Sequence, residues 1–292
     1  MTRSVRRTHR SGRTTRRTRR TLQVAGAGFA ALLALSACSG SDSGYGSDAS
    51  GKSSAAASSS GKDSPDKLSG EVTVFAAASL KESFTALGKE FEQAHPGTEV
   101  TFSFGGSDAL AASITGGAPA DVFASASPKT MKVVTDAGDA AGTPATFVRN
   151  QLEIATLPGN PDKIASLKDL TRSGLKVVLC DKAVPCGAAA RKALDAGGLE
   201  LTPVSYEEDV KSALNKVVLK EADAAVVYRT DVRAAGAKVE GVDFPESADA
   251  VNDYPITLLK GARHTDAAEA FIALVRSAEG QKVLTGAGFL AP

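Results

Sequence analysis

Three turns between an expected strand and an expected helix carry groups that can hold an anion. These groups are Ser79, Ser107 and the pair Cys186 and Gly187. Each turn offers a hydroxyl or a free backbone N–H at a helix start, where N–H groups and the helix dipole attract negative charge. No Lys or Arg adjoins any of these groups, and none of the turns has the GxxxxGK[ST] sequence of a nucleotide phosphate loop. The pattern favours a small, fully ionised oxyanion bound by dipoles alone.

The same residues make a poor nucleophilic site. Ser107 stands in Gly-Ser-Asp, which is not the G-x-S-x-G sequence of a nucleophile elbow. Beyond the N-terminal region the only histidines are His95 and His264, and neither adjoins a candidate serine. His95 also stands in a His-Pro-Gly sequence typical of a helix end. An exported hydrolase is therefore the weaker hypothesis, and we assign no catalytic residue.

The elements that must position these groups alternate between strands and helices. Short β-branched apolar segments predict strands at 72–76, 100–104, 121–124, 147–157, 176–180, 222–228 and 254–259. Helical spacing predicts a helix from residue 80 to the stop at 95, and further helices at 109–114, 188–196, 210–219 and 267–277. Ser79 and Glu82 also have the spacing of a capping box at the first helix.

This alternation predicts an α/β fold. About 225 residues with so many units fit two smaller lobes better than one sheet. We therefore expect each lobe to be a mainly parallel sheet flanked by helices. Ligands of open α/β sheets lie beyond the carboxyl ends of the strands, where the N-termini of the helices point.

Residues 1–37 have the layout of an export signal. Residues 1–20 are basic, and the apolar stretch 22–37 is short for a membrane span. The stretch ends in Leu-Ser-Ala-Cys, which resembles a bacterial lipobox with Cys38 as the first mature, lipid-bearing residue. A paired arginine at 19–20 leaves the choice between general secretory and twin-arginine export open.

Residues 38–67 predict a flexible, lipidated tether. They are rich in Ser, Gly and Ala, and such a composition buries too little apolar surface to offset chain entropy. The predicted layout is therefore a lipid anchor, a tether and a body from residue 68 onward. We expect the protein to be exported and held by lipid at the outer face of the cytoplasmic membrane.

The net charge of the chain hides a strong asymmetry. The whole chain has a formal charge of +1, but residues 1–37 hold nine arginines and no acidic residue. Without those nine, 25 basic residues stand against 33 acidic residues, a net charge of −8. A body with this charge balance lacks the excess of Lys and Arg that nucleic-acid binding requires.

Cys180 and Cys186 are the only thiols of the body. Export favours a disulfide between them, and two buried free thiols are the alternative. The nearby candidate ligands are carboxylates and the histidines lie far off in sequence, so no metal-ligand spacing is present and we predict no metal site.

Five segments together resemble one family. Residues 76–80 (AAASL), 104–107 (FGGS), 121–126 (DVFASA), 184–187 (VPCG) and 224–228 (AAVVY) occur in the order seen in periplasmic molybdate-binding proteins. These are the substrate-binding components of ABC transporters. The resemblance implies a two-lobed body that the chain crosses more than once, with the oxyanion in the cleft between the lobes. We expect lobe 1 to be formed by 68–146 and 252–292 and lobe 2 by 147–251.

The resemblance also implies a set of ligand-binding residues. Ser79 and Ser107 would bind the oxyanion from lobe 1 through hydroxyl and backbone N–H groups. Cys186 and Val210 would contribute backbone N–H groups from lobe 2, and Tyr228 its phenol O–H. The cysteine at 186 departs from the alanine that is common there, which a backbone donor tolerates. The ligand would be molybdate or tungstate, with no cofactor.

The expected function is capture of the oxyanion, hinge closure of the lobes and delivery to a membrane permease driven by a cytoplasmic ATPase, with the protein a monomer. Sulfate is smaller and would leave donors unpaired, and a protonated phosphate would need an acceptor. Binding proteins of the same fold for sulfate, phosphate, iron or an organic acid are alternatives, the iron hypothesis resting on Tyr206, Tyr228 and Tyr254. A structural or adhesive lipoprotein would not explain three donor turns.

Overall fold

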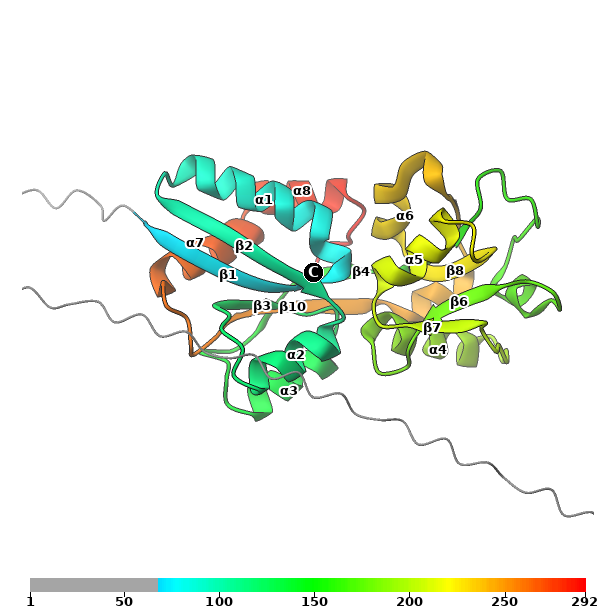
Figure 1. Ribbon diagram of the computed structural model, residues 1–292, viewed down its shortest axis with the longest axis horizontal. Coiled ribbons are helices and arrows are strands. Elements are labelled where there is room, and N and C mark those ends of the chain that lie inside the picture. Colours follow the sequence, from blue (N-terminus) through cyan, green and yellow to red (C-terminus); the bar gives the residue numbers. More distant parts are fainter. Residues whose placement is uncertain (1–67) are drawn as a thin grey trace, which may run out of the picture. The chain divides into compact units, whose positions relative to one another are not determined.

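The computed structural model describes residues 68–292 (Figure 1). The predicted signal peptide, Cys38 and the tether lie outside the described residues. No helix within 68–292 combines the length and apolar character that crossing a membrane requires. The described chain forms two five-stranded sheets, each flanked by helices, so the predicted two-lobed α/β fold is confirmed.

The sheet of lobe 1 has the strand order β2-β1-β3-β10-β4. Its strands are β1 (Gly70–Ala77), β2 (Thr98–Gly105), β3 (Val122–Ala124), β4 (Ala145–Asn150) and β10 (Asn252–Leu258). β1 pairs in parallel with β2 and β3, whereas β10 is antiparallel to both β3 and β4. Four strands therefore run in one direction, and their carboxyl ends meet at one edge.

Helices cover both faces of this sheet (Figure 1). One face carries α1 (Lys81–Ala94), α7 (Thr265–Arg276) and α8 (Ala278–Gly286), and the other carries α2 (Ser107–Thr115) and α3 (Pro128–Asp136). The helical spacing of α1 buries Phe84 and Phe91, whose rings pack edge-on against Phe271 of α7. This apolar face holds α1 against the sheet and so fixes the turn that precedes it.

The sheet of lobe 2 repeats the plan with the order β7-β6-β8-β5-β9. Its strands are β5 (Leu152–Thr156), β6 (Val177–Cys180), β7 (Ser205–Glu207), β8 (Ala224–Tyr228) and β9 (Glu240–Val242). Its α-helices are α4 (Pro185–Ala196), α5 (Val210–Val218) and α6 (Arg229–Ala235). β6, β7 and β8 are parallel, and β5 runs against both β8 and β9.

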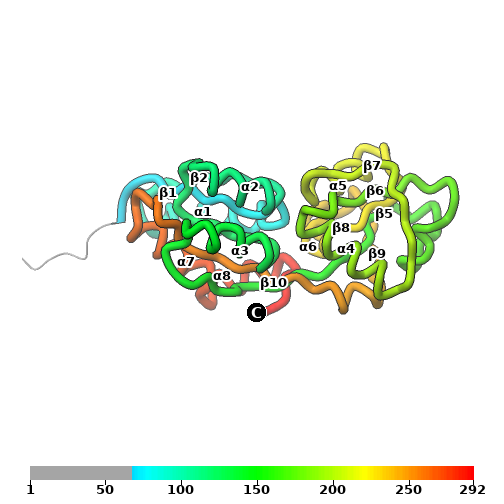
Figure 2. The backbone as a smooth tube through the Cα atoms, turned by 90° about the horizontal axis from the view of Figure 1, so that it is seen from below, coloured from blue at the N-terminus to red at the C-terminus, as the bar shows by residue number. Residues whose placement is uncertain are grey.

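The chain crosses between the lobes twice, and Figure 2 follows both crossings. The first lies at Gln151, between β4 and β5, and the second precedes β10. The predicted single strand over 147–157 is therefore two strands in different sheets. The predicted start of lobe 2 at residue 147 falls inside β4, which pairs with β10 in lobe 1. Both segments are apolar and extended, so the sequence pattern does not mark the crossing.

Candidate functional site

All five residues predicted to bind the ligand line one cavity. Ser79 and Ser107 come from lobe 1, and Cys186, Val210 and Tyr228 come from lobe 2. The cavity has a volume of about 10 Å³, and its other lining residues are Ala77, Ala78, Gly105, Gly106, Ala126, Val184, Pro185 and Asp209. This is far below the ~300 Å³ at which sites for drug-sized organic ligands begin. The lobes therefore enclose very little space here.

Lobe 1 supplies two buried serines at the carboxyl ends of adjacent strands. Ser79 lies in the short 3-10 turn after β1, and its Oγ is 2.8 Å from the hydroxyl of Tyr254. Ser107 is the first residue of α2, and its Oγ accepts a hydrogen bond from the N–H of Ala126 at 3.0 Å. The predicted capping box is wrong, because Ser79 makes no capping bond and α1 begins at Lys81. The hydroxyl of Ser79 instead bonds the hydroxyl of Tyr254, and Ser79 lines the cavity.

The helices that begin at the cavity lack side-chain caps on their first amides. α2 follows Gly106 and α4 follows Val184, and neither residue has a side chain that caps the helix. In α4 the first residue is Pro185, which has no N–H, so Cys186 presents the first amide. These amides have no intrahelical acceptor and are available to an anion.

α5 also begins at the cavity with an uncapped first amide, although a side chain caps the next two amides. Asp209 caps this helix, and its carboxylate accepts from the amides of Lys211 at 2.7 Å and Ser212 at 2.9 Å. The amide of Val210 is left out of the cap, and no protein acceptor for it is present within residues 68–292. The negative charge of Asp209 is thus taken up by its own helix, whereas Val210 faces the cavity with a donor.

Tyr228 is a buried donor at the end of β8. Burial raises the pKa of its phenol well above the usual value, so the hydroxyl stays neutral and protonated. Its oxygen accepts a hydrogen bond from the side-chain amide of Asn252 at 2.7 Å. Tyr254, which backs Ser79, is also fully buried, and burial raises its pKa as well. Both phenols can therefore act only as uncharged groups near neutral pH.

A disulfide joins the end of β6 to the first turn of α4. Cys180 and Cys186 are bonded, with Cα atoms 5.8 Å apart. Gly187 reinforces this junction, because a Cβ atom there would collide with the carbonyl oxygens of Cys180 and Asp181. The bridge and the glycine together hold the α4 amides at the cavity.

The cavity contains no cationic side chain. Asp209 is the one charged residue among its lining groups, and its carboxylate is used in the helix cap. Within residues 68–292, no group of three or more His, Cys, Asp and Glu side chains is arranged to hold a metal ion. Tyr206, which the iron hypothesis requires, lies on the edge strand β7 and is exposed. An anion bound here would be held by amides, hydroxyls and helix dipoles.

Comparisons with known proteins agree with this arrangement. Residues 72–290 match the family described as bacterial extracellular solute-binding protein. The chain is 47% identical over 221 residues to the molybdate-binding protein ModA of Mycobacterium tuberculosis strain H37Rv, covering 76% of this chain and 85% of that protein. The chain belongs to the bacterial extracellular solute-binding protein family. Its relatives are binding proteins rather than enzymes.

Solved structures show the same fold for different anions. The periplasmic molybdate-binding protein of Azotobacter vinelandii has a TM-score of 0.67 at 22% identity, covering 76% of this chain and 99% of that chain. The sulfate-binding protein SubI of Mycobacterium tuberculosis H37Rv has a TM-score of 0.64 at 20% identity, covering 75% and 86%. The fold of this solute-binding protein is therefore shared, and its anion must be argued from the cavity.

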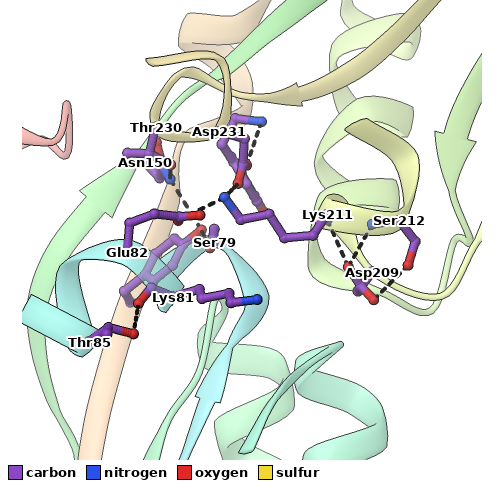
Figure 3. A network of polar contacts seen from close by, with 12 residues as sticks. Ser79, Lys81, Glu82, Thr85, Asn150, Asp209, Lys211, Ser212, Thr230 and Asp231 are labelled. Atoms are coloured by element: carbon purple, nitrogen blue, oxygen red, sulfur yellow. Dashed lines mark hydrogen bonds and ion pairs between the residues drawn. The ribbon is translucent and has the colours of Figure 1, made fainter. Parts of the chain in front are cut away.

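An ion-pair network links the lobes beside the cavity (Figure 3). The ammonium group of Lys211 in α5 lies 2.8 Å from Glu82 of α1 and 3.0 Å from Asp231 of α6. Burial raises the pKa of Asp231 to about 6, although Lys211 opposes the shift. Burial lowers the pKa of Lys211, but Asp231 and Glu82 outweigh it and the net shift is upward. No spacing in the sequence signals this network, since its members are far apart in the chain.

Gly106 is a point of close approach between the lobes. A Cβ atom on this residue would collide with the carbonyl oxygen of Glu208 in lobe 2. The backbone angles of Gly106, φ −60° and ψ 130°, suit any residue. A Cβ atom here would also lie 2.8 Å from Oδ1 of Asp108 in lobe 1, but a carboxylate can rotate away, whereas the backbone of Glu208 cannot. The main reason for glycine is therefore the approach of the two lobes.

We expect Gly106→Ala to weaken anion binding at least about tenfold, because a buried steric conflict costs on the order of 1–3 kcal/mol. Calorimetric titration with molybdate as probe anion measures the change. The melting temperature without anion should stay close to wild type. Gly142→Ala is the control, since a Cβ atom at Gly142 meets nothing within 4 Å. Equal affinities for both variants would contradict the role of Gly106 in lobe approach.

We expect Glu82→Gln to speed anion release about two- to fivefold, because half-exposed ion pairs contribute about 0.2–1 kcal/mol. The variant removes the charge attraction between position 82 and Lys211 across the lobes and keeps the ion pair of Lys211 with Asp231. Stopped-flow release of molybdate measures the rate, and the difference should shrink at high salt. Asp136→Asn is the control, because it breaks the pair with Lys132 inside α3. An unchanged rate in Glu82→Gln would show that the pair does not hold the lobes.

Proposed function

We propose that this chain captures molybdate, and tungstate with it, outside the cytoplasmic membrane for import by an ABC transporter. The observation that carries the proposal is the cavity between the lobes, which offers hydroxyls and helix-start amides but no cation. Such a site suits a small anion that keeps its full charge near neutral pH and needs donors only. The relative from Mycobacterium tuberculosis, 47% identical, is named a molybdate-binding protein, which supports the same ligand.

Selection against other oxyanions follows from size and from protons. Sulfate is smaller than molybdate, so some donors would stay out of reach of its oxygens, and each unpaired buried donor costs about 1–3 kcal/mol. Hydrogen phosphate carries a proton that needs an acceptor, which a donor-only site does not offer. Tungstate has nearly the size and charge of molybdate, so we propose that the site accepts both.

The proposed delivery route follows from the family and the N-terminus. A membrane permease and its ATPase would take the anion from the closed protein. Lipid on Cys38 would keep the protein at the outer face of the cytoplasmic membrane, with residues 38–67 as the tether. A relative from Bacillus subtilis, 30% identical over 226 residues, is named a putative ABC transporter substrate-binding lipoprotein, which supports this arrangement.

Calorimetric titration of the full chain tests the ligand assignment. We expect molybdate and tungstate to bind with similar affinity and to exceed sulfate and phosphate at least about a hundredfold, because several unpaired donors add their costs. Ser79→Ala and Ser107→Ala should each weaken molybdate binding about tenfold or more. Ser113→Ala is the control on the same helix as Ser107, since Ser113 is exposed and bonds only the carbonyl of Ala109. Tight sulfate binding without molybdate binding would refute the assignment.

Membrane attachment is tested separately through Cys38. Expression with a radiolabelled or clickable fatty acid should label the wild-type chain, because the lipobox cysteine is the acceptor of lipid. Cys38→Ala should lose both the label and the membrane fraction, while Cys180→Ala should keep the label. Labelled Cys38→Ala, or unlabelled wild type, would contradict the anchor and leave the ligand assignment untouched.

A further inference from the structure

Each of the three hydroxyls that line the cavity has a hydrogen-bonding partner in the protein. For Ser107 the neighbour is the backbone N–H of Ala126, which is 3.0 Å from Oγ. An N–H can only donate, so the oxygen of Ser107 is the acceptor in this bond. The hydrogen of Ser107 is therefore left to point elsewhere, and Ser107 lines the cavity.

The neighbour of Tyr228 is Asn252, the first residue of β10. One atom of its side-chain amide lies 2.7 Å from the phenol oxygen of Tyr228 and 3.4 Å from the carbonyl oxygen of Pro185. A carbonyl only accepts, so the atom that faces both oxygens must be the NH2 group of Asn252. Tyr228 therefore accepts from Asn252, and its own hydrogen is left for a partner other than Asn252.

The neighbour of Ser79 is Tyr254, which is itself backed by Asn150. The carbonyl oxygen of Asn150 accepts the N–H of Gln151 at 3.0 Å, which fixes the orientation of the amide. Its NH2 group then faces Thr230 at 2.9 Å and the hydroxyl of Tyr254 at 3.4 Å (Figure 3). The bond between Tyr254 and Ser79 can run in either direction. The hydrogen that Tyr254 receives from Asn150 favours Tyr254 as the donor, and Ser79 then turns its own hydrogen outward.

We propose that Asn252 and Asn150 are positioning residues that set the hydrogen direction of Tyr228 and Ser79, so that the cavity presents hydrogens and no hydroxyl lone pair to its anion. Together with the Ala126 amide that donates to Ser107, they leave the hydrogens of all three hydroxyls for the anion. The site then discriminates between anions by whether they carry a proton, beyond their size. Only the identity of the anion in this inference rests on the proposed function.

Asn252→Asp tests the inference most directly. A carboxylate at this position accepts the hydrogen of Tyr228, which turns a lone pair toward the ligand. Molybdate and hydrogen phosphate both carry a double negative charge at mildly alkaline pH, so the added charge weakens both equally. Reversal of the hydroxyl penalises molybdate but suits the proton of hydrogen phosphate. We expect molybdate binding to weaken about a hundredfold and the phosphate-to-molybdate affinity ratio to rise at least about tenfold.

Two further variants separate hydrogen direction from other effects. In a Tyr228→Phe background, Asn252→Asp should leave the ratio unchanged, because there is no hydroxyl to reverse. Asn215→Asp on the exposed side of α5 is the charge control and should change neither affinity nor ratio. A constant ratio in Asn252→Asp, or an equal shift in the Tyr228→Phe background, would overturn the inference.

Asn252→Ala keeps the test decisive if Asn252→Asp does not fold, as judged by circular dichroism. This variant leaves the hydroxyl of Tyr228 free to turn either way, so the phosphate-to-molybdate ratio should still rise, by about threefold, with molybdate about fivefold weaker. Wild-type affinity and ratio in this variant would overturn the inference. If the wild-type chain binds sulfate instead of molybdate, the proposed function fails, and the same variants are compared with sulfate against hydrogen phosphate.

Discussion

The cavity must hold an anion without an opposite charge, and this requirement explains most of the structure around it. Several uncharged donors have to converge on one small space, because each contributes much less than a buried cation would. Helix starts provide such donors when their amides are left uncapped, as after Gly106 and Val184. Parallel strands bring the helix starts together, since their carboxyl ends meet at one edge of each sheet. The small residues Ala77, Ala78 and Gly105 let the backbone approach the same space.

Division of the donors between two lobes makes binding depend on how the lobes meet. Ser79 and Ser107 alone form half a site, and Cys186, Val210 and Tyr228 form the other half. The same surface carries the close approach of Gly106 to Glu208 and the ion pair of Glu82 with Lys211. These contacts involve none of the five predicted ligand-binding residues. Each of them joins a residue of lobe 1 to a residue of lobe 2, so each exists only when the lobes are together. Affinity is therefore a property of the assembled lobes rather than of either one.

All five predicted residues line one cavity, but they were found in two ways. Ser79, Ser107 and Cys186 carry the local signal of a strand-to-helix turn, whereas Val210 and Tyr228 were predicted only from the family resemblance. The residues behind the donors could not be predicted from sequence, since Ser79 and Tyr254 are 175 positions apart and Lys211 and Glu82 are 129 apart. The capping-box prediction failed for a related reason: Ser79 and Glu82 have the local spacing, but tertiary partners take both side chains. The crossing at Gln151 was missed because β4 and β5 are both short, apolar and extended.

The two asparagines behind the donors are also neighbours in the fold. Asn150 ends β4 and Asn252 begins β10, and the two residues are direct partners in the register of these strands. Both strands border the crossings between the lobes, so the asparagines that contact Tyr254 and Tyr228 lie next to these crossings. A change in the angle between the lobes would move Tyr228 relative to Asn252, because one belongs to lobe 2 and the other to lobe 1. The hydrogen direction of Tyr228 therefore depends on the position of the lobes. The hydroxyl of Tyr228 is oriented by Asn252 only when the lobes are together.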